Sequence, residues 1–310
     1  MQAPKPILVL LLEKNSYFFP AVRDERIVAD GVFRDRLIET SPVFKAVNRW
    51  FPSLKRLFYR RSWVSALGQF SKIVVFDVAY KADKSLLSYL HRKAPHAKIF
   101  LYYWNMVKDE AAFLREKQLA EACGAAIFHY DRGDCARYGL QFNSIMYDEH
   151  IALPDLPPLY DCFFLGFSKD REPALKAFHA CLSGAGLRGK YVLVTGGGGE
   201  AAFEYRRRRV AYPEYLAMLS RSRAILDIAQ QGQDGLSLRV MEAIFFNKKL
   251  ITTNRAVKSY AFYSPADILV YEEGKTTGRE IAAFFDAPFV PYAEEFRTYY
   301  SIGAWAERFV

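Results

Sequence analysis

The chain has 310 residues and a formal net charge of +9; 51% of its residues are hydrophobic and 25% are charged. This composition excludes disordered and fibrous proteins, and the length suits two domains of about 150 residues each. The longest aliphatic run near the start, ILVLLL at 7–12, is too short to cross a bilayer and lacks the flanks of a signal peptide. We therefore expect a cytoplasmic protein, and the four cysteines, which have no CxxC spacing, are expected to be buried thiols.

The first half of the chain alternates between strand and helix patterns. Apolar or β-branched runs predict strands, hydrophobic periodicity predicts helices, and Pro95 ends one of the helices. Strands are predicted at 7–12, 72–80, 98–105 and 124–131, and helices at 84–93 and 109–123. A polar loop, EKNSYFFPAVRDER, follows the first strand. Such alternation is the signature of an α/β fold with a doubly wound parallel sheet.

One segment of this half combines basic and aromatic residues. Between Thr40 and Phe76 there is no acidic residue, while seven Lys and Arg residues alternate with seven aromatic ones. Aromatic rings among cations suit the surface of an anionic membrane, so we expect contact with the cytoplasmic membrane through residues 41–72. The alternative is an ordinary pair of surface helices whose aromatic side chains face the core.

The rhythm resumes after a proline-rich segment at 152–161, which reads as a linker between domains. In this second half, strands are predicted at 162–167, 190–194, 224–228 and 249–252, and helices at 172–187, 213–222 and 236–246. The glycine run at 196–199 does not match the dinucleotide fingerprint, because it continues into polar and basic residues instead of a helix with a later acid. We therefore predict no bound cofactor.

The stretch QDGLSLRVMEAIFFNKKLITTN, at 233–254, carries the most specific signal in the sequence. A loop ends and a helix begins at the carboxyl end of a predicted strand, where ligands of open α/β sheets bind. Gly235 permits close backbone approach, and the first helical turn suits a diphosphate. Glu242 lies on an otherwise apolar helix and requires a partner, which could be a ribose diol, Lys248 or Arg239.

The stretch 220–254 and the opening YDCFFLGFSKDR of the second half resemble the nucleotide-sugar-binding segment of GT-B glycosyltransferases, most closely those of bacterial capsule, lipopolysaccharide and exopolysaccharide biosynthesis. The resemblance implies two Rossmann-like domains with parallel sheets, facing each other across a cleft. The acceptor-binding domain would span residues 1–153 and the nucleotide-sugar-binding domain residues 154–292. Residues 293–310 would form a final helix that packs back on the first domain.

The same resemblance assigns roles to single residues. Glu242 would hold the ribose; Gly235, Leu236 and Ser237 would contact the diphosphate; Lys169 and Arg171 would neutralise its charge. Gly166, Gln233 and Arg239 complete the nucleotide-binding set that we expect. Asp234 stands where the family usually has a longer Glu near the donor sugar, and bulky residues follow Glu242, so the retaining or inverting class stays open.

The expected reaction is transfer of a sugar from a nucleotide-sugar donor to a lipid-linked, lipopolysaccharide or capsule-type glycan acceptor at the inner face of the cytoplasmic membrane. Charge builds on the departing diphosphate, and cations with a helix dipole can stabilise it, so no metal ion is predicted. The acceptor proton could go to Asp77, Asp24 or Glu25, each of which could instead be structural. The alternatives are a GT-B-like sugar-nucleotide epimerase and a basic-aromatic protein that binds nucleic acid; we expect no nucleic acid.

Overall fold

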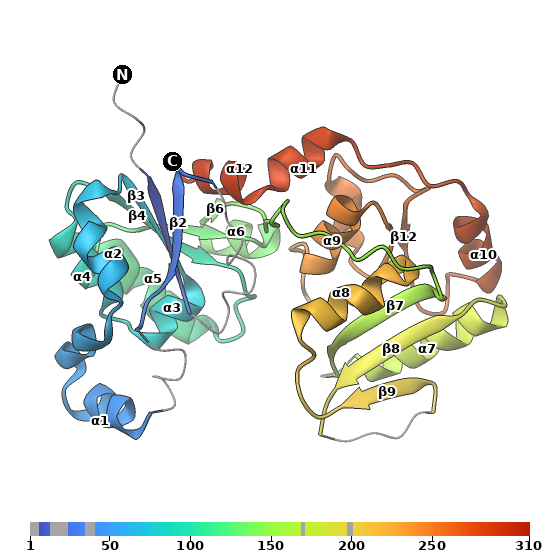
Figure 1. Cartoon of the computed structure of the whole chain (residues 1–310), viewed down its shortest axis with the longest axis horizontal. Helices are drawn as coiled ribbons and strands as arrows, with labels where there is room; N and C mark the ends of the chain where they lie inside the picture. Colours follow the sequence, from blue (N-terminus) through green and yellow to red (C-terminus); the bar gives the residue numbers. More distant parts are fainter. Residues whose placement is uncertain (1–5, 13–23, 35–40, 169–170, 197–200) are drawn as a thin grey trace. The chain divides into compact units, whose positions relative to one another are not determined.

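The computed structural model describes residues 6–12, 24–34, 41–168, 171–196 and 201–310, which divide into two compact units. Unit 1 comprises Met1–His150 together with Ser301–Val310, and unit 2 comprises Ile151–Tyr300. Each unit is a parallel β-sheet with helices packed against it (Figure 1). The predicted α/β class with two Rossmann-like parallel sheets is therefore confirmed.

The sheet of unit 1 has six strands in the order β2-β1-β3-β4-β5-β6. The strands are β1 (Ile7–Leu11), β2 (Ile27–Gly31), β3 (Lys72–Phe76), β4 (Lys98–Tyr103), β5 (Ala126–His129) and β6 (Gln141–Phe142). The helices are α1 (Pro42–Trp50), η3 (Pro52–Phe58), α2 (Arg61–Ala66), η4 (Leu67–Gln69), α3 (Asp77–Ala82), α4 (Leu86–Lys93), α5 (Glu110–Ala122), α6 (Arg132–Tyr138) and α12 (Ile302–Glu307). All pairs are parallel, and the strand order changes direction at β1, which lies between β2 and β3.

The central strands of unit 1 form because they are continuously apolar, as strands covered on both faces must be. β1 is buried at every position, and β3 is buried at all positions but its first. Residues 301–310 complete this core: Trp305 is fully buried, its ring centroid lying 5.1 Å from that of Tyr102 and 4.9 Å from that of Phe309. The side-chain amide of Asn143 donates to the Trp305 carbonyl at 3.1 Å.

The sheet of unit 2 also has six parallel strands, in the order β12-β11-β10-β7-β8-β9. Its strands are β7 (Tyr160–Phe167), β8 (Gly189–Val194), β9 (Phe203–Arg206), β10 (Ser222–Asp227), β11 (Lys249–Thr252) and β12 (Ile268–Val270). The helices are α7 (Glu172–Gly184), α8 (Tyr212–Ser220), α9 (Leu238–Phe246), η5 (Arg255–Ser259), α10 (Gly278–Asp286) and α11 (Glu294–Tyr300). β8 and β9 follow β7 on one side of it, and β10, β11 and β12 follow in order on its other side. This is the strand order of the dinucleotide-binding Rossmann fold, with its switch point between β7 and β10.

Several boundaries differ from those predicted. The predicted strand 72–80 ends at Phe76, and the next six residues form α3. The single final helix predicted over 293–310 is two short helices, because α11 ends at Tyr300 and Ser301 caps α12 by accepting a hydrogen bond from Ala304 N. The chain accordingly passes from unit 2 to unit 1 at residues 300–301 and from unit 1 to unit 2 at residues 150–151.

Candidate functional site

The carboxyl ends of β7 and β10 flank the switch point of the unit 2 sheet. In sheets of this kind the ligand lies outside these strand ends, because the connections that follow the two strands diverge to opposite faces. β7 ends at Phe167 and leads to α7, while β10 ends at Asp227 and leads to α9. The predicted nucleotide-binding residues come from these two connections, so the fold gathers them at one edge of the sheet.

Asp227 organises this edge. The residue is 1% exposed and ends β10. Its carboxylate accepts hydrogen bonds from the hydroxyls of Ser237, at 2.8 Å, and Thr252, at 2.9 Å. The guanidinium of Arg239 lies 3.7 Å from the same carboxylate. Asp227 thus ties the start of α9 to the end of β11, and the sequence analysis missed it although a lone acid after an apolar strand, AILD, was a usable signal.

Two arginines meet beside Asp227. Arg239, on α9, donates to the carbonyl of Leu165 and lies over the Phe164 ring, 4.7 Å from its centroid. Arg171 directly precedes α7; burial and the nearby positive charge of Arg239 lower its pKa to about 10. The Nε atoms of both arginines are buried and have no hydrogen-bond acceptor among the described residues. Arg239 also acts on the buried Glu242, so what points to an anion is the set of unused guanidinium donors, which is the chemistry of an anion site.

Gly166 is part of this arrangement because a side chain there would displace one of the arginines. A Cβ at position 166 would lie 2.8 Å from a terminal nitrogen of Arg239 and 3.1 Å from the Phe164 ring. Lys169, which was predicted to act with Arg171, lies outside the described residues.

The loop before α9 is fixed by its own side chains. Asn254 donates to the carbonyls of Asp234, at 3.3 Å, and Gly235, at 3.2 Å. The side chain of Gln233 donates to the Gly235 carbonyl at 3.0 Å and accepts from Gln230 N at 3.2 Å. Gln233 therefore stabilises the loop, while Asp234 is exposed.

Leu236 and Ser237, which were predicted to contact the diphosphate, direct their side chains to other parts of unit 2. Leu236 is buried in the core, and the Ser237 hydroxyl is engaged with Asp227. A phosphate at this position would therefore contact the backbone of Gly235, Leu236 and Ser237 and not the Leu236 or Ser237 side chain. Ser237 is the N-cap of α9. Val240 N donates to the Ser237 carbonyl at 3.1 Å, whereas the amide groups of Leu238 and Arg239 have no partner within the helix.

Glu242 has partners within the chain. Its carboxylate is 1% exposed and accepts hydrogen bonds from the hydroxyls of Tyr212, at 3.1 Å, and Tyr215. Burial raises the pKa of Glu242 to about 7, although the two hydroxyls and the charge of Arg239 oppose the shift. Of the partners considered from the sequence, Lys248 donates to the carbonyls of Ser220 and Ser222 instead, and Arg239 acts on Glu242 only through its charge. Because the two tyrosines satisfy the carboxylate, the need for a partner is no longer by itself an argument for a ribose. Tyr212 and Tyr215 were missed, because no local pattern links them to a residue 27 to 30 positions later.

In unit 1, Asp77 occupies the corresponding edge. It is the first residue of α3, directly after β3, and it is fully buried. Lys81 donates to its carboxylate at 3.0 Å, and the Asn105 amide donates at 3.3 Å. Burial raises the pKa of Asp77, and the interactions with Lys81 and Asn105 only partly oppose this effect. Asp77 is thus a buried carboxyl with Lys81 and Asn105 as partners, and its role as a general base stays a prediction.

The expectation that Asp24 and Glu25 stand at the same edge is wrong. They precede β2, which runs parallel to β1 with Ile27 opposite Ile7, so both residues lie at the amino edge of the sheet. The reason is an unpredicted strand: the chain must return to the amino edge before β2 can begin. There Asp24 is bridged to Arg26 at 2.6 Å, and this interaction lowers the pKa of Asp24.

The arginines at the two ends of the basic run 206–209 make different contacts. Arg206 pairs with Glu204 and, at 3.5 Å, with Glu214. Arg209 lies over the ring of Phe167, 5.2 Å from its centroid, at the carboxyl end of β7. Only Arg209 is thereby placed beside the switch point.

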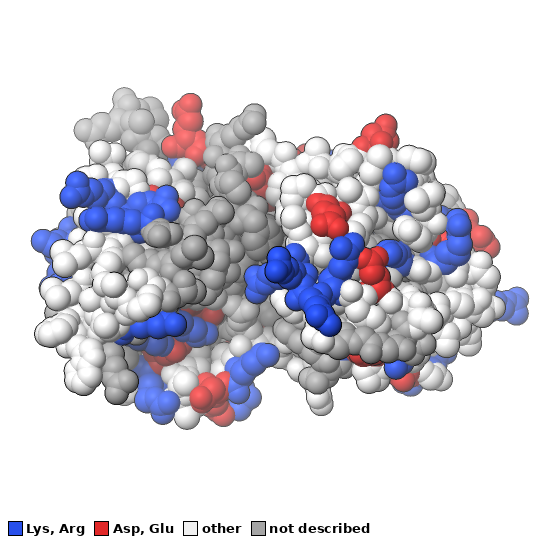
Figure 2. Space-filling view, turned by 60° about the horizontal axis from the view of Figure 1, so that its bottom comes forward, with Lys and Arg blue, Asp and Glu red and all other residues white. Residues whose placement is uncertain are grey.

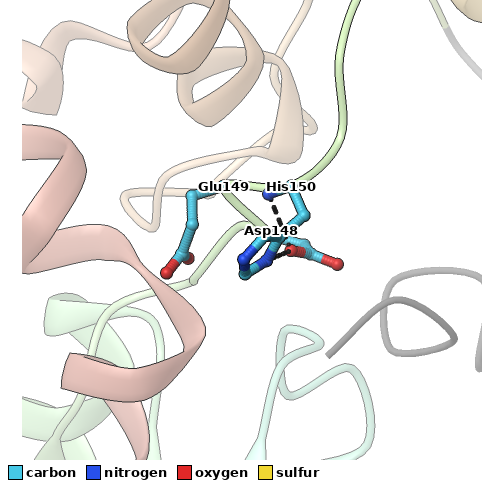
Figure 3. Close-up of side chains that lie close together, drawn as sticks. All are labelled: Asp148, Glu149 and His150. Carbon is cyan, nitrogen blue, oxygen red and sulfur yellow. Dashed lines mark hydrogen bonds and ion pairs between the residues drawn. The ribbon is translucent and has the colours of Figure 1, made fainter. Parts of the chain in front are cut away.

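A further group of possible metal ligands lies at the end of unit 1. Asp148, Glu149 and His150 bring ligand atoms within 4.8 Å of one another (Figure 3). The Asp148 carboxylate accepts from His150 N and contacts His150 Nδ1, both at 3.0 Å, so its nearer oxygen is already used. In Figure 3 the side chains of Glu149 and His150 extend to the same side of the backbone, and the Glu149 carboxylate lies beside the His150 ring. The group lies on a turn at 149–150, and the second Asp148 oxygen is buried without a hydrogen-bond partner among the described residues.

Comparison of the sequence with protein-family models and with curated proteins gave no match. Within the part of the chain that the structure describes, no helix has the length and apolar character needed to cross a bilayer.

Proposed function

We propose that the chain is a metal-independent glycosyltransferase of the GT-B type that uses a nucleotide-sugar donor and a lipid-linked or polysaccharide-type acceptor. The observation that carries the proposal is the pair Arg171 and Arg239 beside the switch point of the unit 2 sheet. The two guanidinium groups lie beside Asp227, and Arg239 also interacts with Glu242; the buried Nε atoms of both arginines have no acceptor among the described residues. A diphosphate supplies acceptors for these donors.

The chemistry requires stabilisation of a leaving group. When the acceptor oxygen attacks the anomeric carbon, the bond from that carbon to the diphosphate breaks and the diphosphate keeps the electron pair. The two guanidinium groups and the amide groups at the start of α9 would bind this developing charge. Asp77 stays the predicted acceptor of the proton, and its raised pKa suits that role.

Glu242 can hold a ribose only by exchanging a hydrogen bond. Tyr215 is buried, whereas Tyr212 is half-buried and has the longer bond to the carboxylate. A ribose hydroxyl would therefore replace Tyr212 at one oxygen while Tyr215 keeps the other. We propose that Glu242 accepts one ribose hydroxyl rather than two.

The test is calorimetric titration with UDP, GDP, CDP, ADP and CMP, each with EDTA and with Mg²⁺. One of the diphosphates should bind regardless of the metal, and at about 100 times its Kd it should stabilise unit 2 by about 2.7 kcal/mol. Arg171→Gln and Arg239→Gln should each weaken binding at least tenfold, since a charge-assisted hydrogen bond is worth about 1.5 to 3 kcal/mol. Arg255→Gln is the matched control, because this guanidinium is exposed and pairs with Glu272.

Failure of every nucleotide to bind, or equal affinity in all three variants, would overturn the proposal. Conversion of the bound sugar nucleotide to its epimer without an acceptor would indicate the epimerase instead.

A further inference from the structure

The apolar face of α1 points outward. Val43, Ala46, Val47 and Trp50 recur at the spacing of one helical face, which in a surface helix normally packs on the core. Here Val43 is 62% exposed and Trp50 is 68% exposed. The residue that anchors α1 is Phe44, whose ring lies 5.1 Å from that of Phe33 and 5.6 Å from that of Phe58. Folding of unit 1 thus leaves this face in contact with solvent.

The next element extends the same kind of surface. η3 is a 3₁₀ helix, in which residues three apart eclipse each other, and Phe51, Leu54 and Leu57 have that spacing. They are 61%, 44% and 63% exposed. Five of the large exposed apolar side chains among the described residues therefore fall within fifteen consecutive positions, 43–57. We call Val43, Trp50, Phe51, Leu54 and Leu57 the apolar ridge.

The other aromatic residues of this segment belong to the core. Tyr59, Trp63 and Phe70 are each at most 2% exposed, and Tyr59 and Trp63 pack against each other at 5.2 Å. The expectation of an aromatic surface along the whole of 41–72 is too broad. The ridge occupies only α1 and η3, which lie at the end of unit 1 away from the strands (Figure 1).

Charge distinguishes between possible occupants of the ridge. The chain has no acid from Ser41 to Phe76. Lys55 is paired with the buried Asp83 at 3.5 Å and Arg60 with Asp30 at 3.3 Å, whereas Lys45 and Arg61 are exposed and form no ion pair among the described residues. Figure 2, turned so that this end comes forward, shows a largely uncharged area on unit 1 with Lys and Arg near its borders. An apolar ridge bordered by cations, with no acid in its own segment, is complementary to an anionic lipid surface.

We propose that the apolar ridge inserts into the headgroup region of an anionic bilayer, so that unit 1 binds the membrane surface through α1 and η3. Trp50 and Phe51 would lie at the interface, where aromatic rings are favoured, and Leu54 and Leu57 would reach the acyl boundary. The proposal does not depend on the transfer reaction, because the ridge belongs to unit 1 and the arginine pair to unit 2.

The experiment is flotation of the full chain with vesicles of phosphatidylglycerol and phosphatidylcholine, compared with vesicles of phosphatidylcholine alone. The wild type should float with the anionic vesicles and be released by salt. Phe51→Ala/Leu54→Ala/Leu57→Ala should reduce vesicle affinity by about tenfold or more, since each residue removes apolar area from the inserted surface. Leu114→Ala/Leu119→Ala is the matched control, because it removes exposed apolar side chains from α5.

Trp50 gives an independent readout of depth. Trp63 and Trp305 are fully buried, and Trp104 is half-buried with its ring packed on that of Phe76, so quenching by lipids with brominated acyl chains should act mainly on Trp50 and should be lost in Trp50→Phe. Absence of flotation, or equal flotation of the wild type and the triple variant, would overturn the proposal. So would a dimer that the triple variant abolishes in the absence of lipid, since the ridge would then bind a second copy of the chain.

Discussion

Tyr215 on α8 donates its hydroxyl to the buried carboxylate of Glu242 on α9. Tyr212 donates to the other oxygen, and its ring stacks on that of Tyr215 with an interplanar angle of 14°. The two helices that flank β10 in the sequence are thus joined through one acid. Any ligand of Glu242 competes with a contact that also stabilises unit 2.

The first prediction concerns the pH dependence that this acid gives to unit 2. The folded-state pKa of Glu242 is about 7, above its ordinary value of 4.5, so the folded chain binds more protons than the unfolded chain between these values. The stability contributed by this carboxyl is full below about pH 4.5 and is lost as the pH rises through about 7. Relative to Glu242→Gln, the wild type should lose up to about 3 kcal/mol over this range.

Urea unfolding of the two proteins at about pH 5 and about pH 8 measures this difference. Glu294→Gln serves as a control, because Glu294 is exposed. Parallel pH profiles for the wild type and Glu242→Gln would contradict the prediction.

The second prediction concerns access to the arginine pair. In Gly166→Ala the new methyl group would lie 2.8 Å from the Arg239 guanidinium, which must then move. Nucleoside diphosphate affinity should fall about tenfold, the equivalent of one charge-assisted hydrogen bond. Gly184→Ala, at the end of α7, meets no atom within 4 Å and should bind as the wild type does. Calorimetry on both variants decides, and equal affinities would show that Arg239 is not positioned by Gly166.

A third prediction addresses a buried cation that has no part in the proposed reaction. The Lys249 ammonium donates to the carbonyls of Ala266, Phe284 and Ala287, at 2.9, 2.6 and 2.8 Å. Two of these carbonyls belong to the end of α10 and the residue that follows it, where a cation is favoured. Lys249→Met should lower the free energy of unfolding of unit 2 by about 3 kcal/mol, because three buried acceptors lose their donor.

Lys275→Met is the control for this variant, since Lys275 is exposed and pairs with Glu272 at the surface. It should change stability by less than about 1 kcal/mol. Thermal unfolding of both variants tests the difference, and similar melting temperatures would mean that the carbonyls find other donors.

The fourth prediction compares an acid at the carboxyl edge of the unit 1 sheet, Asp77, with one at its amino edge, Asp24. If Asp77 is the base, Asp77→Asn should reduce the rate of transfer about 10²- to 10⁴-fold. Asp24→Asn, at the amino edge, should leave that rate unchanged. Nucleoside diphosphate release from the donor in the presence of a membrane extract as the acceptor source measures both rates. A large loss in Asp24→Asn, with donor binding intact, would refute the assignment.

The central strands were readable from the sequence, and most of the edge strands were not. β1 is apolar throughout, and β3, β4 and β10 are apolar at their central positions, because these strands are covered on both faces. β2, β9 and β12 are edge strands with half-exposed positions, and the sequences IVADG and FEYR of the first two are partly polar. Because β2 was not predicted, Asp24 and Glu25 were assigned to the loop at the carboxyl end of the first strand, whereas they lie at the amino edge of the sheet.

The site was predictable where a motif is local. Arg239 and Gly235 were included in the predicted site because they lie in one continuous segment that leads from a strand into a helix, and their role in binding stays a prediction. Asp227 acts through side chains from α9 and β11, and the tyrosines reach Glu242 from another helix. Such contacts depend on how the helices pack, and the spacing along the chain does not encode them.

The division of unit 1 has a consequence for synthesis of the chain. Trp305 and Phe309, whose rings pack on those of Tyr102 and Phe100, emerge from the ribosome only after all of unit 2. Until then β4 carries an uncovered aromatic surface, although the strands of unit 1 have long been made. Unit 1 can therefore complete its core only after residues 301–310, which follow unit 2 in the sequence, have been made.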